Sequence, residues 1–175
     1  MKTEYLLARD MEHVLAALTP ANQLVCRVCL HTGLRLGDVL ALRTDQIKRQ
    51  GWITERKTGK KRQIGLPDAL ISAVRAQAGP IWAFPGRLDA KKHRTRQSVW
   101  KDVKRASRAF RLPQNVAPHS LRKMYAVELL SKYGDVERVK RALNHSDVTT
   151  TMLYAMADKL LTARPARRRK KKKTP

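Results

Sequence analysis

Apolar residues recur three and four positions apart along the first third of the chain, which is the spacing of one face of an α-helix. The first such stripe consists of Met11, Val14, Leu15 and Leu18. Asp10 directly precedes this stripe and is a candidate N-cap for the helix. Pro20 opens a second helix, since proline is favoured at the first helical position, and Gly33 ends it. The core face of this second helix consists of Val25, Val28 and Cys29.

Residues 46–66 form the one stretch whose pattern is typical of β-strands. The residues in order are Trp52, Ile53 and Thr54 before Lys57, then a turn of Thr58, Gly59 and Lys60, then Gln63, Ile64 and Leu66 before Pro67. We predict a basic hairpin that reaches into a groove of its partner. The alternative is a charged strand edge that only deters aggregation.

The rest of the chain returns to helical spacing, with short turns between helices. Asp68 is a candidate cap for the next helix, and residues 81–86 predict a buried turn. Thr95 opens another helix, and its inward stripe is expected to be Val99, Val103, Ala106 and Phe110. A further helix covers residues 121–133, and Gly134 ends it. These elements predict a mainly α fold with one small antiparallel β-hairpin (α+β).

The balance of charge narrows the choice of partner. The 175 residues include 38 Lys and Arg but 14 Asp and Glu, which gives a net charge of +24 and an isoelectric point near 11.0. Such a charge resists compaction unless a polyanion offsets it, so a nucleic acid is the expected partner. A membrane surface or a heparin-like polymer could also satisfy the charge, but three Trp and two Phe are few for a membrane anchor. No apolar run approaches the roughly 18 residues of a membrane span, and no signal-peptide pattern opens the chain, so the expected location is the cytoplasm.

The charge is densest at the C-terminal end. Residues 164–175 read RPARRRKKKKTP, and a basic segment of such low complexity is expected to be disordered and to add salt-sensitive phosphate binding. It also resembles a nuclear localisation patch, so a nuclear location stays open for a eukaryotic or viral source. The remaining residues, 1–163, have the size of one domain.

Cys26 and Cys29 raise the question of a metal site. Their C-x-x-C spacing has His31 nearby, but no second cysteine pair follows, and the spacing does not fit a zinc finger. On a helix both thiols lie on one face and behave as small apolar groups. We therefore expect two buried cysteines and no metal.

Two candidate chemical groups stand close together in the last third of the chain. His119 and Arg122 are three positions apart at the start of a predicted helix, so they share one face. Arginine offers a planar fork of donors that fits a phosphate, and histidine can donate a hydrogen bond or move a proton near neutral pH. The pair alone could also arise by chance in so basic a chain.

A second pair of candidates follows. His145 stands in a predicted turn, and Tyr154 lies near the end of a short helix expected over 147–156. A tyrosine hydroxyl is a poor nucleophile at its usual pKa of about 10. It therefore needs neighbours that take its proton or stabilise its oxyanion. Taken singly, Tyr154 could equally be a core tyrosine.

Four motifs occurring together change this balance. They are TGLRLGD at 32–38, KTGKKR at 57–62 before a strand-like QIGLP, HSLR at 119–122 and LNHSDVTTTMLY at 143–154. With them, nearly the whole chain resembles the catalytic domain of the tyrosine recombinases, the phage integrase family. Asn144 replaces a common glycine, and residues 123–125 replace a more usual His-Thr-Phe, but neither departure touches a key position.

The resemblance implies a site-specific DNA recombinase or integrase that works through a 3′-phosphotyrosyl intermediate, without a metal or any other cofactor. Tyr154 would be the nucleophile. The groups implied around the phosphate are Arg35, Lys57, His119, Arg122 and His145. Asp38 is implied as a support of this site, although it could simply cap the helix that follows Arg35. Lys60 is the alternative to Lys57 as general acid.

The expected partner in this family is double-stranded DNA, with four protomers on two duplexes. The candidate DNA contacts are Lys60, Lys61, Arg62, Lys91, Lys92, Arg94 and Arg96. The alternative for the basic loop over 87–96 is a merely solvated surface. Relatives usually carry an N-terminal DNA-binding domain, which we expect to be absent here, so a separate DNA-binding or directionality partner is a further expectation.

Two other functions remain open from the sequence. A type IB topoisomerase-like enzyme would use the same groups but reseal the strand within one duplex. A non-catalytic basic DNA-binding protein could keep the fold without the activity. The presence of all six key residues favours an enzyme.

Overall fold

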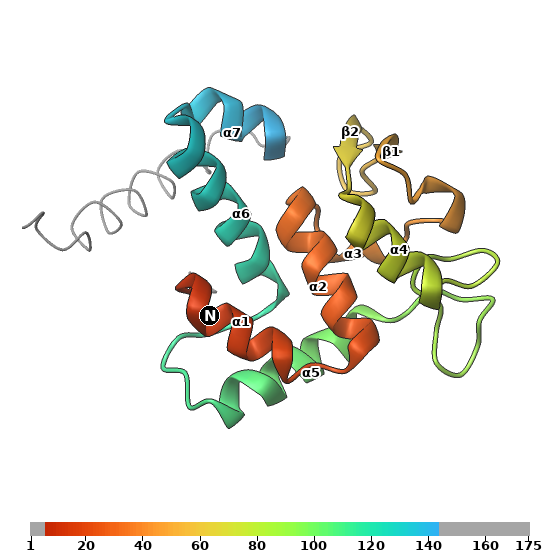
Figure 1. Cartoon of the computed structure of the whole chain (residues 1–175), viewed down its shortest axis with the longest axis horizontal. Helices are drawn as coiled ribbons and strands as arrows, with labels where there is room; N and C mark the ends of the chain where they lie inside the picture. Colours follow the sequence, from red (N-terminus) through yellow and green to blue (C-terminus); the bar gives the residue numbers. More distant parts are fainter. Residues whose placement is uncertain (1–5, 144–175) are drawn as a thin grey trace, which may run out of the picture.

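The computed structural model describes residues 6–143 (Figure 1). His145, Tyr154, the helix expected over 147–156 and the tail over 164–175 lie outside the described residues. Within them the elements are α1 (Ala8–Ala16), α2 (Pro20–Thr32), α3 (Leu36–Leu40), the 3-10 helix η1 (Thr44–Gln46), β1 (Gln50–Thr54), β2 (Lys61–Gly65), α4 (Asp68–Gln77), α5 (Arg96–Ala109), α6 (Pro118–Tyr133) and α7 (Val136–Leu143). The expected fold class, mainly α with a small antiparallel hairpin, is confirmed. No helix among residues 6–143 is both long and apolar enough to cross a membrane.

Helix α2 lies at the centre of the fold, in contact with α1, α3, α4, α5 and α6 (Figure 1). Pro20 is its first residue, and Gly33 caps its end at φ +65°, a left-handed conformation that glycine adopts without steric cost. Cys26 and Cys29 are buried in its core face as free thiols. Burial raises the pKa of Cys26 to about 12, so this thiol stays neutral. The predicted burial of both cysteines is confirmed.

The β-hairpin buries one face of its two strands. Thr54 pairs with Lys61 and Gln50 with Gly65. The inward positions include Ile53 and Ile64, while Trp52 on the other face is 65% exposed. The turn lies between Glu55 and Lys60, because the Glu55 amide donates to the Lys60 carbonyl at 3.0 Å and the Gly59 amide donates to the Glu55 carbonyl at 2.8 Å. It includes the expected Thr58 and Gly59, and it begins earlier than expected. Lys57 therefore lies within the turn itself.

Two expected helix caps are wrong. Helix α1 already begins at Ala8 with Leu7 as its N-cap, which places Asp10 inside its first turn. Helix α4 begins with Asp68 itself, whose carboxylate lies 2.6 Å from the Arg49 guanidinium. Both acids still lie in a first turn, where a negative charge interacts favourably with the helix dipole.

Helix α5 begins as expected, because the Thr95 hydroxyl accepts a hydrogen bond from the Ser98 amide at 3.2 Å. The inward positions Val99, Val103 and Ala106 are buried. Phe110 is an exception to the predicted stripe. It follows the last residue of the helix, is 43% exposed, and stacks on His13 with ring centroids 5.5 Å apart.

Two further expectations are confirmed. Ala83 and Phe84, in the turn over 81–86, are fully buried. Gly134 caps α6 at φ +66°. Helix α6 begins at Pro118, so His119 and Arg122 lie in its first two turns. The helix packs on α2 and α5.

Candidate active site

A cleft of about 1200 Å³ brings the candidate catalytic side chains together from three separate segments. Arg35 comes from the turn between α2 and α3, and Lys57 comes from the hairpin turn. His119 and Arg122 come from the start of α6. The two nearest of these segments in sequence are still about 20 residues apart. The cleft therefore gathers all four of the candidate catalytic residues that lie within the described chain.

Arg35 is held by a carboxylate that sequence analysis missed. Its Nη1 donates to Glu55 Oε2 at 2.6 Å, and Glu55 is fully buried directly after β1. The Thr58 hydroxyl donates to the same oxygen at 3.0 Å. Burial by itself raises the pKa of Glu55, but the hydrogen bonds from Arg35 and Thr58 outweigh it and lower the pKa. Glu55 is therefore an anion within the wall of the cleft.

A sequence signal for Glu55 was present but weak. Ile53 faces the core, and side chains alternate along a strand, so the position two residues later shares the inward phase. A lone acid next to five basic residues in 56–62 is easily taken for a surface charge.

Arg122 is held by backbone carbonyls. It is 3% exposed and donates from Nη1 to the Gly33 carbonyl and from Nη2 to the Leu143 carbonyl, both at 2.5 Å. Burial, together with the positive charges of Arg35 and Arg62, lowers the pKa of Arg122 to about 10. At this pKa the group is still a cation at neutral pH. Its acceptors are uncharged carbonyls, and no ion pair to a carboxylate is found for it among the described residues.

Gly33 links Arg122 to the end of α2. A Cβ atom at Gly33 would lie 2.2 Å from the ring of Tyr125, one turn beyond Arg122 on α6. The absence of a side chain therefore lets α6 approach α2 closely enough for the Gly33 carbonyl to accept from Arg122.

Lys57 is exposed in the hairpin turn, and Asp38 supports that turn from α3. Asp38 is 6% exposed, and its Oδ1 accepts a hydrogen bond from the backbone amide of Arg56 at 3.0 Å. Asp38 lies inside α3, whose N-cap is Arg35, so it is not the cap of that helix. This contact is what the expected supporting role of Asp38 requires.

His119 is exposed at the cleft. Partial desolvation by the surrounding protein lowers the pKa of His119, and the positive charges of Lys123, Arg122, Arg35 and Lys57 lower it further. The imidazole is therefore neutral near pH 7, and a neutral imidazole can accept a proton.

The candidate DNA contacts divide into two groups. Five side chains are exposed: Lys60, Lys61, Lys91, Lys92 and Arg96. Arg96 also lines the cleft. Arg94 instead points inward, with its Nη1 3.2 Å from Asn22 Oδ1. Arg62 is 9% exposed, donates to the Thr32 carbonyl, and lies 3.6 Å from Glu55.

The position of Arg62 changes the expectation for it. It pairs with Ile53 on the inward face of the hairpin, so its guanidinium is turned to the core and not to a groove of DNA. The alternation of the strand explains this, because Ile64, two positions later, faces the same way.

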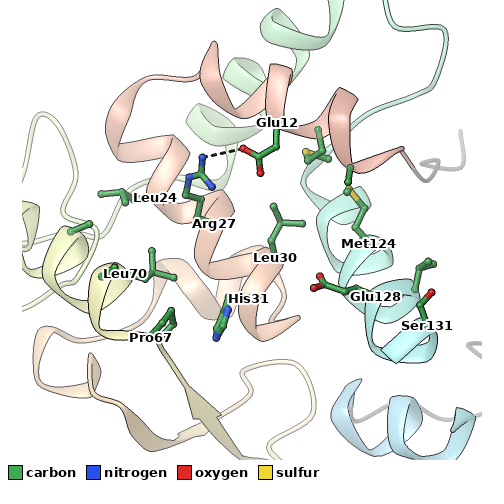
Figure 2. A pocket seen from close by; sticks show the side chains of 15 residues that line it. Glu12, Leu24, Arg27, Leu30, His31, Pro67, Leu70, Met124, Glu128 and Ser131 are labelled. Carbon is green, nitrogen blue, oxygen red and sulfur yellow. Dashed lines mark hydrogen bonds and ion pairs between the residues drawn. The ribbon is translucent and has the colours of Figure 1, made fainter. Parts of the chain in front are cut away.

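A second hollow has a different character. It lies between α1, α2, α4 and α6 and is lined mainly by apolar side chains, among them Leu24, Leu30, Leu70 and Met124 (Figure 2). Its one ion pair joins Arg27 and Glu12 at 3.2 Å, as the dashed line in Figure 2 marks. None of the four candidate catalytic residues within the described chain lines it. Among residues 6–143, no group of three or more His, Cys, Asp or Glu side chains could hold a metal ion.

Comparison with known proteins agrees with this geometry. The sequence pattern of the phage integrase family matches residues 4–160. The chain is 27% identical to the integrase of Escherichia phage P2 over 155 residues, which cover 88% of this chain and 43% of that protein. It is 30% identical to tyrosine recombinase XerD of Mycobacterium tuberculosis over 151 residues, which cover 79% of this chain and 49% of the relative. The chain thus spans about half the length of the curated relatives that it matches.

Solved structures show the same fold. The crystal structure of XerA recombinase matches with a TM-score of 0.71 at 17% identity and covers 95% of this chain and 66% of that one. The catalytic domain of bacteriophage HP1 integrase matches with a TM-score of 0.63 at 24% identity and covers 94% and 97%.

Proposed function

The chain belongs to the phage integrase family, and on that basis we propose that it is a tyrosine-type site-specific DNA recombinase. The observation that supports the proposal is the cleft in which Arg35, Lys57, His119 and Arg122 meet from three segments of the chain. Two guanidinium groups, an ammonium group and a neutral imidazole are the groups that transfer of a phosphodiester to a hydroxyl needs.

The proposed reaction proceeds by attack of the Tyr154 oxygen on a scissile DNA phosphate. The bond from phosphorus to the 5′ oxygen breaks, and a 3′-phosphotyrosyl link forms. His119 accepts the phenolic proton, and Lys57 gives a proton to the departing 5′ oxygen. Arg35 and Arg122 bind the non-bridging oxygens, and His145 donates a hydrogen bond to them. A 5′-hydroxyl from a second duplex then reverses the step and exchanges the strands.

The charges of the cleft replace the charge that a metal would supply in phosphoryl transfer. The energy of the phosphodiester is retained in the tyrosyl link, so the reaction consumes no nucleotide.

We propose double-stranded DNA as substrate and partner, with four protomers on two sites. Five exposed basic residues are the proposed contacts to its backbone: Lys60, Lys61, Lys91, Lys92 and Arg96. A separate DNA-binding or directionality partner belongs to the same proposal. The proposed place of action is the compartment that holds the DNA, which is the cytoplasm in a bacterium.

Solved structures of similar recombinases support DNA as the partner. One matching structure is a XerH recombinase bound to a palindromic difH substrate, and another is a dimer of lambda integrase bound to a core site. Both are complexes of relatives with DNA, at 20% and 18% identity to this chain.

The test is covalent trapping on DNA. The protein is mixed with supercoiled DNA that carries its native flanking sequence, without metal or ATP, and the reaction is stopped in detergent. We expect a protein–DNA adduct whose modified peptide contains Tyr154. Tyr154→Phe should form no adduct and should bind DNA with unchanged salt sensitivity, because only the nucleophilic oxygen is lost. An adduct formed by Tyr154→Phe would refute the assignment of the nucleophile.

The same preparation separates a recombinase from a type IB topoisomerase. A recombinase joins strands between two duplexes that carry its site, whereas a topoisomerase relaxes supercoils on any DNA without exchange. Relaxation of unrelated plasmids at the rate seen with the native site would contradict the proposal.

A further inference from the structure

We propose that Glu55 is a positioning residue for the cleavage reaction, which holds the guanidinium of Arg35 where it can neutralise a non-bridging oxygen of the scissile phosphate. This inference rests on the proposed function. Glu55 is fully buried and does not line the cleft. It acts through Arg35, which does line the cleft.

The contacts of Glu55 join the two segments that carry Arg35 and Lys57. One carboxylate oxygen accepts from Arg35 at 2.6 Å and from Thr58 at 3.0 Å. The other oxygen lies 3.6 Å from Arg62. Thr58 directly follows Lys57, so one buried carboxylate connects the hairpin turn with the turn between α2 and α3.

The contact with Arg35 leaves donors for a phosphate. A guanidinium has five N–H donors in a fixed plane, and Glu55 engages only the Nη1 end in the described structure. The Arg35 side chain is 21% exposed, whereas Glu55 is 0% exposed, so the arginine is open on the side away from its partner. Because the guanidinium is planar, fixing it at one end keeps its other N–H donors in a defined plane.

Charge gives a second reason for a carboxylate at this position. Arg35, Arg62 and Arg122 lie near enough to one another that their charges affect the Arg122 guanidinium, and Glu55 opposes that effect. Without an anion among them, mutual repulsion would drive Arg35, the most exposed of the three, toward solvent. Repulsion would leave Arg122 in place, because backbone carbonyls hold it.

Stability alone does not account for Glu55. Burying an ion pair adds little net stability compared with an apolar pair of the same volume, because desolvation offsets the attraction. A buried glutamate beside Arg35 does, however, determine where the guanidinium lies. Preorganised charge of this kind lowers a barrier without reorganisation during the reaction.

Glu55→Gln is the test variant, because it keeps the size of the side chain and a carbonyl oxygen but removes the charge. Asp68→Asn is its matched control. Asp68 also loses one negative charge next to an arginine, with Arg49 at 2.6 Å, but it is exposed and does not line the cleft. Thermal unfolding of both variants shows whether each is folded at the assay temperature.

The decisive measurement compares two scissile groups at the phosphate where the wild-type protein becomes linked. One is the normal phosphodiester, and the other is a methylphosphonate, which lacks the negative charge that Arg35 neutralises. We expect Glu55→Gln to slow single-turnover adduct formation on the diester by about 10- to 100-fold, and on the methylphosphonate by less than about threefold. DNA affinity should not weaken, because the protein has gained positive charge. Asp68→Asn should match the wild type on both substrates.

Equal losses on the two substrates would overturn the inference, since a general structural defect does not depend on the charge of the phosphate. An unchanged rate on the diester would overturn it as well. If the wild-type protein forms no adduct on either substrate, the proposed function fails.

A second measurement does not depend on cleavage. The guanidinium resonances of Arg35, assigned with Arg35→Lys, can be followed by NMR in the free protein. We expect slow exchange and restricted rotation in the wild type and in Asp68→Asn, and rapid averaging in Glu55→Gln. Restricted rotation retained in Glu55→Gln would contradict the positioning role whatever the enzyme does.

Discussion

The cleft holds its two candidate catalytic arginines by different means, with Arg35 on the side of the hairpin and Arg122 on the side of α6. Arg35 is fixed by a single buried carboxylate, Glu55, which offsets part of its charge. Arg122 is fixed by two backbone carbonyls, which are uncharged acceptors. The first arginine therefore depends on one ion, and the second depends on where the ends of α2 and α7 lie.

This difference separates two kinds of mutation. A change of charge at Glu55 acts on Arg35 and leaves the backbone in place. A change of backbone at Gly33 moves the acceptor of Arg122 and leaves the carboxylate in place.

Removal of Arg122 should have the largest effect. Arg122→Ala should slow single-turnover cleavage by about 100- to 1000-fold, the cost of losing one preorganised donor to a developing charge. Arg27→Ala is the control, since Arg27 is an exposed arginine at the apolar hollow, paired with Glu12 (Figure 2). Near-normal cleavage by a folded Arg122→Ala protein would remove Arg122 from the catalytic set.

Gly33→Ala should break the same side through the backbone. Alanine at a left-handed position costs about 1–2 kcal/mol of stability, and the new Cβ atom would lie 2.2 Å from the Tyr125 ring. Gly134→Ala is the matched control, because Gly134 caps α6 at φ +66° with no atom within 4 Å of a new Cβ. Chemical denaturation should show a larger loss for Gly33→Ala than for Gly134→Ala, and only Gly33→Ala should impair cleavage. Equal losses would show that the packing of α6 on α2 does not depend on Gly33.

Asp38→Ala should loosen the hairpin side without removing any group from the reaction. The Arg56 amide loses its acceptor, so the turn that carries Lys57 is less well placed. We expect cleavage to slow by about tenfold, less than for loss of a donor. Asp38→Asn keeps a carbonyl oxygen at the same place and should retain most of the rate. If the two variants are equally slow, the charge of Asp38 and not its hydrogen bond is what matters.

The pH profile of cleavage tests the environment of His119. Its pKa lies below the ordinary value, so His119 stays neutral as the pH falls through about 6.5. If neutral His119 accepts the phenolic proton, the rate should fall only at lower pH. Lys123→Met removes one of the charges that lower this pKa, so the fall should move to higher pH. Lys132→Met, also on α6, is the control. A profile that Lys123→Met leaves unchanged would contradict the assignment.

The smallest effect on chemistry is expected in the basic loop. Lys91 and Lys92 are exposed and do not line the cleft. Replacing both with alanine should reduce the slope of log affinity against log salt by about 1.8 if each contacts a phosphate. The rate at saturating protein should not change. An unchanged slope would favour a merely solvated loop.

Much of the fold could be predicted because its signals are local. Pro20 and Gly33 bound α2, Gly134 ends α6, and the alternation over 50–65 marks the hairpin. Asp10 and Asp68 were misplaced as caps because an acid in a first turn and an acid at the N-cap follow the same preference.

The site was only partly predictable. Motifs identified Arg35, Lys57, His119 and Arg122, and the cleft unites them. The partners that hold them depend on contacts between distant segments, such as Arg122 with the Gly33 carbonyl 89 residues away. No local pattern marks such a carbonyl. Arg62 was expected at the surface because its charge was weighed above the inward phase of its strand.

The central claim is that this cleft presents its groups to one scissile phosphate, with Lys57 at the 5′ oxygen. A substrate with sulfur in place of that bridging 5′ oxygen tests it most directly, because a thiolate departs without a proton. Single-turnover cleavage by Lys57→Ala and by the wild type is measured on both substrates. The account predicts a loss of about 100-fold or more for Lys57→Ala on the normal substrate, and nearly the wild-type rate on the sulfur substrate. An equal loss on both substrates would contradict it.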